Sequence, residues 1–178
     1  MYISEIMTTA PTDQRGDLET RTWQALDKLG IKYERVDNDV VESMDECVEI
    51  SDKLGAEIRK TIVVCNRQKT EFYLAILPAN KRFDGKLFAA MMRTARVSFA
   101  SPEDMEKVIG LTPGEASVMG ILNDTEGKVQ VVIDKAVADA EWFACNPGAN
   151  TSHLKFKTKQ LINNFLPSNK HKPEIIML

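Results

Sequence analysis

The sequence has few of the residues on which most hydrolytic and redox sites depend. It contains only two histidines, His153 and His171, and neither stands beside an obvious nucleophile. Its three cysteines form no CxxC pair; they are Cys47, Cys65 and Cys145. Zinc sites and nucleophilic triads need such clusters, so the sequence argues against both. If the chain is an enzyme, we expect water to be the nucleophile and positioning to supply most of the catalysis.

Several familiar motifs are also absent. There is no Walker loop, no GxSxG elbow, no HExxH and no GxGxxG after a strand, so these phosphate-binding and hydrolase signatures do not apply. No apolar run approaches the length of a membrane span, and no charged leader with an apolar stretch opens the chain. We therefore expect a cytoplasmic protein with no membrane partner.

The distribution of charge is uneven along the chain. The net charge of −3 gives no overall basic field for binding nucleic acid. Residues 1–59 carry 14 acidic and 7 basic side chains, a net −7, whereas residues 60–178 carry 12 and 16, a net +4. A polyanionic ligand is therefore expected at the later part of the chain. The alternative is a chance fluctuation over a solvated surface.

Hydrophobic periodicity and capping signals predict a single α/β domain over residues 1–178, with a C-terminal tail at 167–178 after the last helix. We expect a mixed, curled or barrel-like β-sheet surrounded by helices. The expected helices are 17–29, 43–54, 84–92, 102–109 and 158–166. In the same order, their expected N-terminal caps are Asp17, a Ser43–Glu46 capping box, Asp84, Ser101 and Thr158. Pro167 is expected to end the last helix. The expected strands are 31–36, 61–65 paired with 71–77, 96–100, 117–122 paired with 129–133, 141–145 and 151–156. Cys65 and Cys145 fall in apolar stretches and are expected to be buried, reduced thiols.

Lys60 is the first candidate for chemistry. It begins an apolar, β-branched run, and burial of that run places the ammonium at the edge of the strand, facing whatever cavity the sheet forms. A fixed cation there can bind a phosphate or stabilise negative charge on an oxygen. The alternative, which is the commoner case, is a lysine that only reaches solvent beside an apolar strand.

Two further groups of residues are candidates for binding. Lys81 and Arg82 follow a core strand and precede a helix, a place suited to phosphate or ribose, with a solvated turn as the alternative. Gly114, Ser117 and Gly120 flank a predicted strand. Glycines there let the backbone approach a ligand and present N–H groups, and turn geometry is the alternative explanation.

The loop after residue 145 is too long and too polar for a plain hairpin turn. Asn146, Asn150 and Thr151 offer amide and hydroxyl groups between two short strands. Together with the cation at Lys60, these loops predict a polar ligand pocket with little acid–base machinery.

Taken in order, these segments resemble the YbaK and prolyl-tRNA-synthetase-associated domain family, the freestanding aminoacyl-tRNA deacylases. The resemblance covers about residues 18–166 and depends on the order and spacing of motifs that are not decisive singly. It is strongest to the prolyl-tRNA editing branch, the ProX or PrdX type. The matching residues are Lys60-Thr61, Leu77–Asp84, Val97–Ser101, Leu111–Gly114, Gly120–Asp124, Asn146-Pro147 and Asn150-Thr151.

The resemblance implies hydrolysis of the ester between a wrong amino acid and tRNA, typically alanine on proline tRNA, with no metal or other cofactor. It implies that aminoacylated tRNA is the partner, with prolyl-tRNA synthetase as a second candidate partner. Lys60 is then the key catalytic residue. The residues expected to bind the substrate are Thr61, Lys81, Arg82, Gly114, Ser117, Gly120, Asn146, Asn150 and Thr151.

Two positions depart from the prolyl-tRNA editing branch. Thr61 stands where that branch usually has asparagine, as in the cysteine-editing relatives, and Asn146 stands where it commonly has histidine. These departures leave two alternatives open: a deacylase for seryl, threonyl or cysteinyl esters, and a module that binds tRNA or a synthetase without turnover. A third alternative is a regulator that binds a free amino acid or nucleotide. Rates over a panel of mischarged tRNAs separate these hypotheses.

Overall fold

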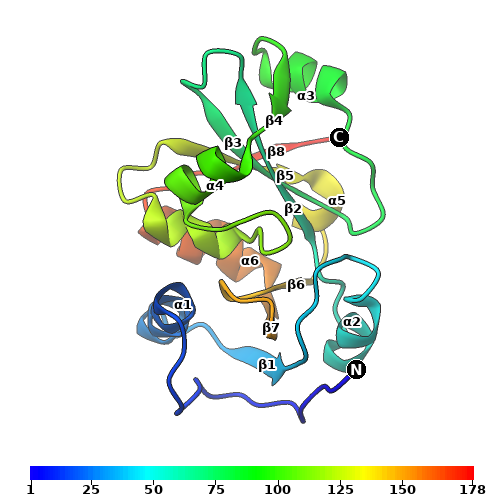
Figure 1. Ribbon diagram of the computed structural model, residues 1–178, viewed down its shortest axis with the longest axis vertical. Coiled ribbons are helices and arrows are strands. Elements are labelled where there is room, and N and C mark those ends of the chain that lie inside the picture. Colours follow the sequence, from blue (N-terminus) through cyan, green and yellow to red (C-terminus); the bar gives the residue numbers. More distant parts are fainter.

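Two β-sheets form the framework of the molecule, which the computed structural model describes over residues 1–178 (Figure 1). The larger sheet has the strand order β4-β2-β3-β5-β8, and the smaller has the order β1-β7-β6. The larger sheet consists of β2 (Lys60–Asn66), β3 (Phe72–Leu77), β4 (Val97–Phe99), β5 (Val129–Asp134) and β8 (Glu174–Ile176). The smaller consists of β1 (Tyr33–Asp37), β6 (Trp142–Cys145) and β7 (Ser152–Lys157). The predicted mixed α/β class is confirmed, but the sheets do not close into a barrel.

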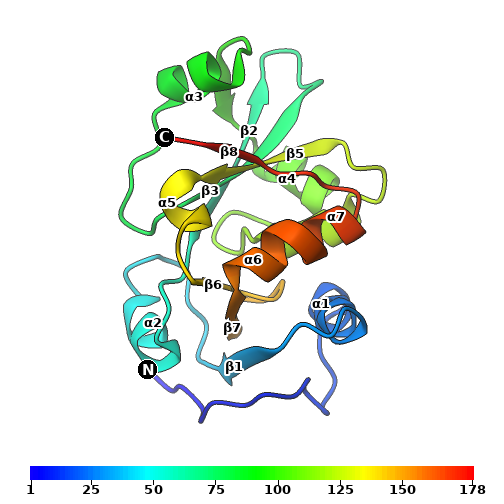
Figure 2. The same cartoon turned by 180° about the vertical axis from the view of Figure 1, so that it is seen from behind.

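Helices flank both sheets. The α-helices are α1 (Asp17–Lys28), α2 (Val48–Leu54), α3 (Gly85–Met92), α4 (Pro102–Ile109), α5 (Lys135–Ala138), α6 (Thr158–Gln160) and α7 (Leu166–Ser168). A 3-10 helix, η1, spans Val118–Asn123, and a π-helical turn, η2, spans Leu161–Phe165 between α6 and α7. Seen from behind, α6 to α7 form one continuous helical segment (Figure 2). None of these helices combines the length and the apolar character needed to cross a membrane.

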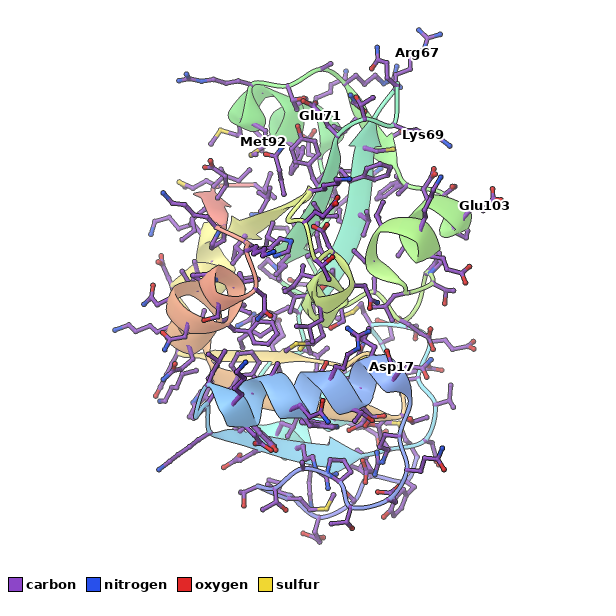
Figure 3. The ribbon with its side chains drawn as sticks, turned by 90° about the vertical axis from the view of Figure 1, so that its left-hand side faces the viewer. Asp17, Arg67, Lys69, Glu71, Met92 and Glu103 are labelled. Carbon is purple, nitrogen blue, oxygen red and sulfur yellow. The ribbon has the colours of Figure 1, made fainter.

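The two halves of the molecule are clear from the side (Figure 3). In one half, α1 lies along the smaller sheet, and Asp17 marks its start. In the other half, the β2–β3 hairpin extends to its turn, where Arg67 points outward. Strands β2 and β3 pair in the predicted antiparallel register.

A main core of 27 buried residues joins the two sheets. It contains Leu74 and Ile133 from the larger sheet and Phe143 and Phe156 from the smaller. The two phenylalanine rings meet edge to face, with centroids 5.7 Å apart. Smaller apolar clusters lie under α2 and under α3. Because the main core takes side chains from both sheets, the burial of apolar surface holds the sheets in one arrangement.

Several local predictions are confirmed by the hydrogen bonds. The capping box forms before α2: the Ser43 N–H donates to Glu46 Oε2 at 3.1 Å, and the Glu46 N–H donates to Ser43 Oγ at 3.4 Å. Asp84 caps α3 by accepting from two backbone N–H groups, and Ser101 caps α4 in the same way with one. These short-range signals are local chemistry, which explains why the sequence alone shows them.

The predicted strand at residues 117–122 is wrong. This segment forms η1, capped by Ser117, whose Oγ accepts from the Met119 N–H at 3.2 Å. Strand β5 instead pairs in parallel with β3 and with β8. A short apolar run that is buried on all sides has no period that separates a strand from a helix. Gly120 packs tightly here, because a Cβ at this position would lie 2.8 Å from the Cβ of Ile109.

Two predicted helix starts and one predicted helix end also need correction. Asp17 is the first residue of α1, and Gly16 is the N-cap. Thr158 is the first residue of α6 rather than its cap, and its buried hydroxyl has no hydrogen-bond partner. Pro167 lies within α7, so the helical segment continues past it to Ser168 instead of ending before it.

The C-terminal residues 167–178, which the sequence analysis describes as a tail, contribute a strand. His171 is buried, and its Nε2 lies 2.8 Å from Asp124 Oδ2. Beyond it, β8 joins β5 in parallel, with Ile175 opposite Ile133. The apolar tip of the chain therefore forms an edge of the larger sheet.

Candidate active site

The junction between the two sheets places Lys60. Ile58 forms a parallel bridge to Ala144 of β6, and the Arg59 N–H donates to the Ala144 carbonyl at 3.0 Å. Two residues later, Lys60 pairs with Leu77 as the first residue of β2 in the larger sheet. The chain thus passes from one sheet to the other within three residues. The half-buried Lys60 side chain starts at the point where the sheets separate.

A pocket of about 230 Å³ opens at this junction. Its walls come from the loop before α2, from the start of β2, from the loop before η1, and from the β6–β7 hairpin. It is smaller than the ~300–1,000 Å³ pockets that hold drug-sized ligands, so it suits a small group. The predicted site residues that line it are Lys60, Thr61, Gly114, Asn146 and Asn150.

The other predicted site residues lie outside this pocket. Lys81 forms an ion pair with the buried Asp134 at 2.7 Å, while its backbone carbonyl accepts a hydrogen bond from the Lys60 ammonium. Ser117 is buried, and its Oγ donates to the Asn146 carbonyl at 2.7 Å. Gly120 is buried against Ile109, as described above. Arg82 and Thr151 are exposed, Arg82 on a neighbouring groove.

Asn146 holds two loops together and is not free to reorient. Its side-chain Nδ2 donates to the Glu115 carbonyl at 3.1 Å, and its Oδ1 accepts from the Gly148 N–H at 2.9 Å. The residue is only 8% exposed. The amide therefore shapes the pocket wall by joining the loop before η1 to the β6–β7 hairpin.

Two residues of the pocket have backbone N–H groups with no acceptor in the protein. Gly114 and Ala116 both line the pocket, and neither donates a backbone hydrogen bond. Gly114 has a φ of +91°, which residues with side chains rarely adopt. An ammonium together with unpaired N–H groups is the kind of donor set that stabilises negative charge on an oxygen.

His153, which the sequence analysis did not select, is a further polar residue of the pocket. It lies on β7 opposite Val36 and is 2% exposed. Its Nδ1 lies 2.9 Å from Asn38 Oδ1. The Asn38 Nδ2 donates to the carbonyls of Asp39 and Asn150 at 2.7 and 3.1 Å, so Oδ1 is the acceptor and His153 Nδ1 carries the proton. Burial lowers the pKa of His153 to about 4, and the ring is therefore neutral at pH 7.

The pairing register of β6 and β7 is the feature that predicts His153 as a neighbour of Asn146. Strands β6 and β7 pair Cys145 with Leu154, so the next pair in this register is Asn146 and His153. Directly opposed residues of an antiparallel pair point to the same face of the sheet. The prolyl-tRNA editing branch commonly has a histidine at the position of Asn146. In this chain the histidine of the pocket is His153, which lies on the neighbouring strand β7.

The thiols at the pocket are not nucleophiles. Burial raises the pKa of Cys145 to about 12 and that of Cys47 to about 11. The thiolate is the reactive form, so both are inert near pH 7. All three cysteines are buried and free, as predicted for Cys65 and Cys145. No three His, Cys, Asp or Glu side chains converge in an arrangement that could hold a metal ion.

A wider groove of about 1110 Å³ begins beside the loop that accepts the Lys60 hydrogen bond. Three cations line it, Arg82, Lys86 and Arg96, together with Phe83. The Phe83 ring lies 5.9 Å from that of Phe99, which is 67% exposed. Cations beside an exposed aromatic ring are typical of surfaces that bind single-stranded nucleic acid.

The residues of the pocket and of the groove fall within a known protein domain. The model of the aminoacyl-tRNA editing domain matches residues 39–163, a stretch that contains Lys60, the walls of the pocket and the basic groove. The chain belongs to the aminoacyl-tRNA editing domain family.

Individual relatives of this editing domain agree with that assignment. The prolyl-tRNA editing protein ProX of Acetoanaerobium sticklandii is 28% identical over 136 residues, which cover 76% of this chain and 83% of the relative. A solved structure described as a candidate trans-editing enzyme for prolyl-tRNA synthetase has a TM-score of 0.68 and 16% identity, covering 93% of this chain and 99% of that one. A second structure, described only as a hypothetical protein, has a TM-score of 0.67 and 15% identity, covering 88% and 97%. At these identities the two structures show a shared fold.

The editing domain thus combines charged and neutral polar residues around one small pocket. Lys60 and Glu42 carry opposite charges, Gly114 and Ala116 have backbone N–H groups with no protein acceptor, and the smaller sheet contributes neutral hydrogen-bonding side chains. No side chain in the pocket with a shifted pKa titrates near pH 7, because those of His153 and Cys145 are displaced to about 4 and about 12.

Proposed function

We propose that this protein hydrolyses the ester between a wrong amino acid and tRNA, with alanine on proline tRNA as its preferred substrate. The observation that carries the proposal is the placement of Lys60. Its half-buried side chain lines a pocket of about 230 Å³, at the junction of two sheets and next to a basic groove. The family assignment supports the reaction class, and the prolyl-tRNA editing relative supports the choice of tRNA.

The chemistry follows from the groups in the pocket. An aminoacyl ester is activated, so a positioned water molecule attacks its carbonyl carbon without a protein nucleophile. Negative charge then develops on the carbonyl oxygen, where the Lys60 ammonium and the N–H groups of Gly114 and Ala116 stabilise it. The bond to the ribose oxygen breaks, and the neighbouring ribose hydroxyl relays the proton of the water to that oxygen. The products are the free amino acid and uncharged tRNA.

The volume of the pocket supports a preference for a small amino acid. A pocket distinguishes an amino acid from one that is smaller by a methylene group by only ~1–3 kcal/mol of binding free energy. An amino acid that is too large is excluded more strongly, because it collides with the walls. A pocket of about 230 Å³, with Asn146 tied to both loops, has little freedom to expand. Alanine therefore fits, and we expect proline, the correct residue, to be rejected by the shape of the walls and not by the volume of the pocket.

The tRNA partner is assigned to the basic groove. The cations Arg82, Lys86 and Arg96 are positioned to contact phosphates of the acceptor end, and Phe99 offers a surface on which a base can stack. The names of two relatives point to proline tRNA and to prolyl-tRNA synthetase, and we propose that synthetase as the source of the mischarged substrate.

A panel of mischarged tRNAs tests the proposal. Proline tRNA charged with alanine, serine, threonine, cysteine or proline is incubated with the protein, and release of the amino acid is followed with time. We expect alanine to be released fastest and proline to be retained. Faster release of serine, threonine or cysteine would change the assigned substrate, and binding of charged tRNA with no release would replace hydrolysis by a binding role.

A further inference from the structure

One hydrogen-bond acceptor at the pocket has no assigned partner: the Nε2 atom of His153. Because Nδ1 carries the proton and donates to Asn38, Nε2 retains a lone pair. The buried side-chain polar atoms without a partner are Arg59 Nε and Thr158 Oγ1, so Nε2 is not sealed in the interior. His153 lines the pocket, and Nε2 is therefore available to a molecule bound there.

The surroundings of His153 hold this acceptor in one orientation. Strand β7 is the central strand of the smaller sheet, between β1 and β6. Asn38 is itself held by two hydrogen bonds from its Nδ2, to the carbonyls of Asp39 and Asn150. A side chain fixed by a buried partner on a central strand has the rigidity that a binding residue needs.

The protonation state of His153 suits binding better than proton transfer. Burial lowers the pKa of the ring to about 4, so Nε2 stays unprotonated at physiological pH. A ring whose protonated form has a pKa of about 4 is a weak base and accepts a proton poorly at pH 7. The same neutral nitrogen accepts a hydrogen bond well, and it adds no positive charge to a pocket that already contains Lys60.

We propose that His153 Nε2 binds the α-amino group of the aminoacyl ester, an inference that rests on the proposed function. The α-ammonium is the only positive charge of an alanyl ester. Lys60, on the β2 side of the pocket, repels it, whereas the charge of Arg59 is offset by its ion pair with Glu57. Glu42, on the loop before α2, attracts it to the pocket, and His153 on the smaller sheet is the neutral acceptor there. His153 is thus a substrate-binding residue that orients the ester carbonyl towards Lys60. The pocket then favours esters with a free amino group over those without one.

Two non-hydrolysable probes isolate this contact. In 3′-alanylamino-3′-deoxyadenosine an amide replaces the ester, and 3′-propionylamino-3′-deoxyadenosine is the same molecule without the amino group. Dissociation constants are measured at pH 6.5, where an α-amino group is mostly protonated and His153 is still neutral. A hydrogen bond to a charged group makes the wild type bind the alanyl probe about tenfold to a hundredfold more tightly than the propionyl probe.

A matched pair of variants separates the binding role from a structural one. His153→Asn retains a donor for Asn38 near the Nδ1 position and removes the acceptor at Nε2. His153→Gln places an amide oxygen near the Nε2 position. We expect His153→Asn to bind both probes equally and His153→Gln to regain part of the preference for the alanyl probe. A preference that persists in His153→Asn, or that is absent in the wild type, overturns the inference.

A spectroscopic measurement on the wild type tests the same contact without any variant, and so does not depend on whether the variants fold. The chain has only two histidines, so the ¹⁵N resonance of His153 Nε2 can be assigned against His171. We expect it to move to lower frequency when the alanyl probe binds and not when the propionyl probe binds. Equal responses to the two probes contradict the inference.

The outcome is distinguishable from failure of the proposed function. If the wild type releases no amino acid from any charged tRNA but prefers the alanyl probe through His153, the hydrolysis proposal fails and the amino-group contact stands. If the wild type releases the amino acid but binds the two probes equally, the hydrolysis proposal stands and the amino-group contact fails.

Discussion

The two walls of the pocket differ in the kind of interaction that they offer. The wall from β2 and its neighbouring loop carries fixed positive charge, with Lys60 in the pocket and Arg82 on the adjoining groove. The wall from the smaller sheet carries Asn146, Asn150 and His153, which are all neutral near pH 7. A charged wall beside a neutral hydrogen-bonding wall is the arrangement expected for a substrate with an anionic end and a small polar end.

This difference assigns the two parts of recognition to different elements. Charge acts over a distance of about a Debye length, so the cationic wall attracts RNA whatever amino acid it carries. Hydrogen-bonding groups act only in contact, so the neutral wall is where the amino acid is identified. Variants of the neutral wall should alter stability and selectivity, and variants of the cationic wall should alter RNA binding and rate.

The largest expected effect on stability concerns His153. Its pKa in the folded state, about 4, lies below the ordinary histidine value of 6.5, so between these values the unfolded chain binds a proton that the folded chain does not. The contribution is complete above pH 6.5 and is lost as the pH falls towards 4, by about 3 kcal/mol in all. Urea unfolding of the wild type and of His153→Asn at pH 7 and pH 4.5 measures it. The variant should lose less stability over this interval, and an equal loss in both proteins would contradict the burial of a neutral ring.

A second test compares the two asparagines of the neutral wall. Asn146→Ala leaves the Glu115 carbonyl and the Gly148 N–H without partners, which we expect to lower the free energy of unfolding by about 1–3 kcal/mol. Asn150 takes part in the network through its backbone carbonyl, so Asn150→Ala should change the free energy of unfolding by less than about 0.5 kcal/mol. Urea titration of both variants provides the comparison. Equal costs would show that Asn146 does not tie the two loops.

A third test concerns the support behind the neutral wall. In Gly120→Ala the new methyl group would lie 2.8 Å from Ile109 Cβ and 3.0 Å from the Ile109 carbonyl oxygen. Overpacking of this kind costs about 1–3 kcal/mol, and urea unfolding should show that loss. Gly85→Ala is the control, because its Cβ would have only ordinary contacts at 3.7 Å or more. An unchanged stability for Gly120→Ala would mean that η1 can shift easily.

The smallest effect is expected on the groove. Removing both cations in Arg82→Ala/Lys86→Ala should raise the KM for charged tRNA several-fold and leave kcat unchanged. Each lost phosphate contact should also lower the slope of log K against log salt by about one. Lys159→Ala on α6 is the control, since this exposed lysine lies outside the groove. A fall in kcat with an unchanged KM would place Arg82 and Lys86 in the chemistry instead.

Short-range chemistry explains why part of the molecule could be predicted from the sequence. The capping box at Ser43, the cap at Asp84 and the β2–β3 hairpin depend on residues a few positions apart, and all three are present. Lys60 could be placed for the same reason, because burial of the apolar run after it determines which end of the strand is polar.

Long-range pairing explains what could not be predicted. The parallel pairing of β3 with β5 and the bond from His153 to Asn38 join residues far apart in the chain. The apolar run at 117–122 matched strand and helix equally well, and its packing against Ile109 decided between them. Ser117 and Gly120, predicted to bind the substrate, are both buried: Ser117 donates to the Asn146 carbonyl and Gly120 packs against Ile109.

The most direct test of the account is the deacylation rate of a Lys60→Met variant, which keeps the length of the side chain and removes its charge. Single-turnover release of alanine from proline tRNA is compared for the wild type, Lys60→Met and Lys159→Met, with unfolding curves to establish that each is folded. Loss of one preorganised donor to the developing oxyanion should lower the rate by about two to three powers of ten in Lys60→Met alone. A folded Lys60→Met protein that releases alanine as fast as the wild type would contradict the account.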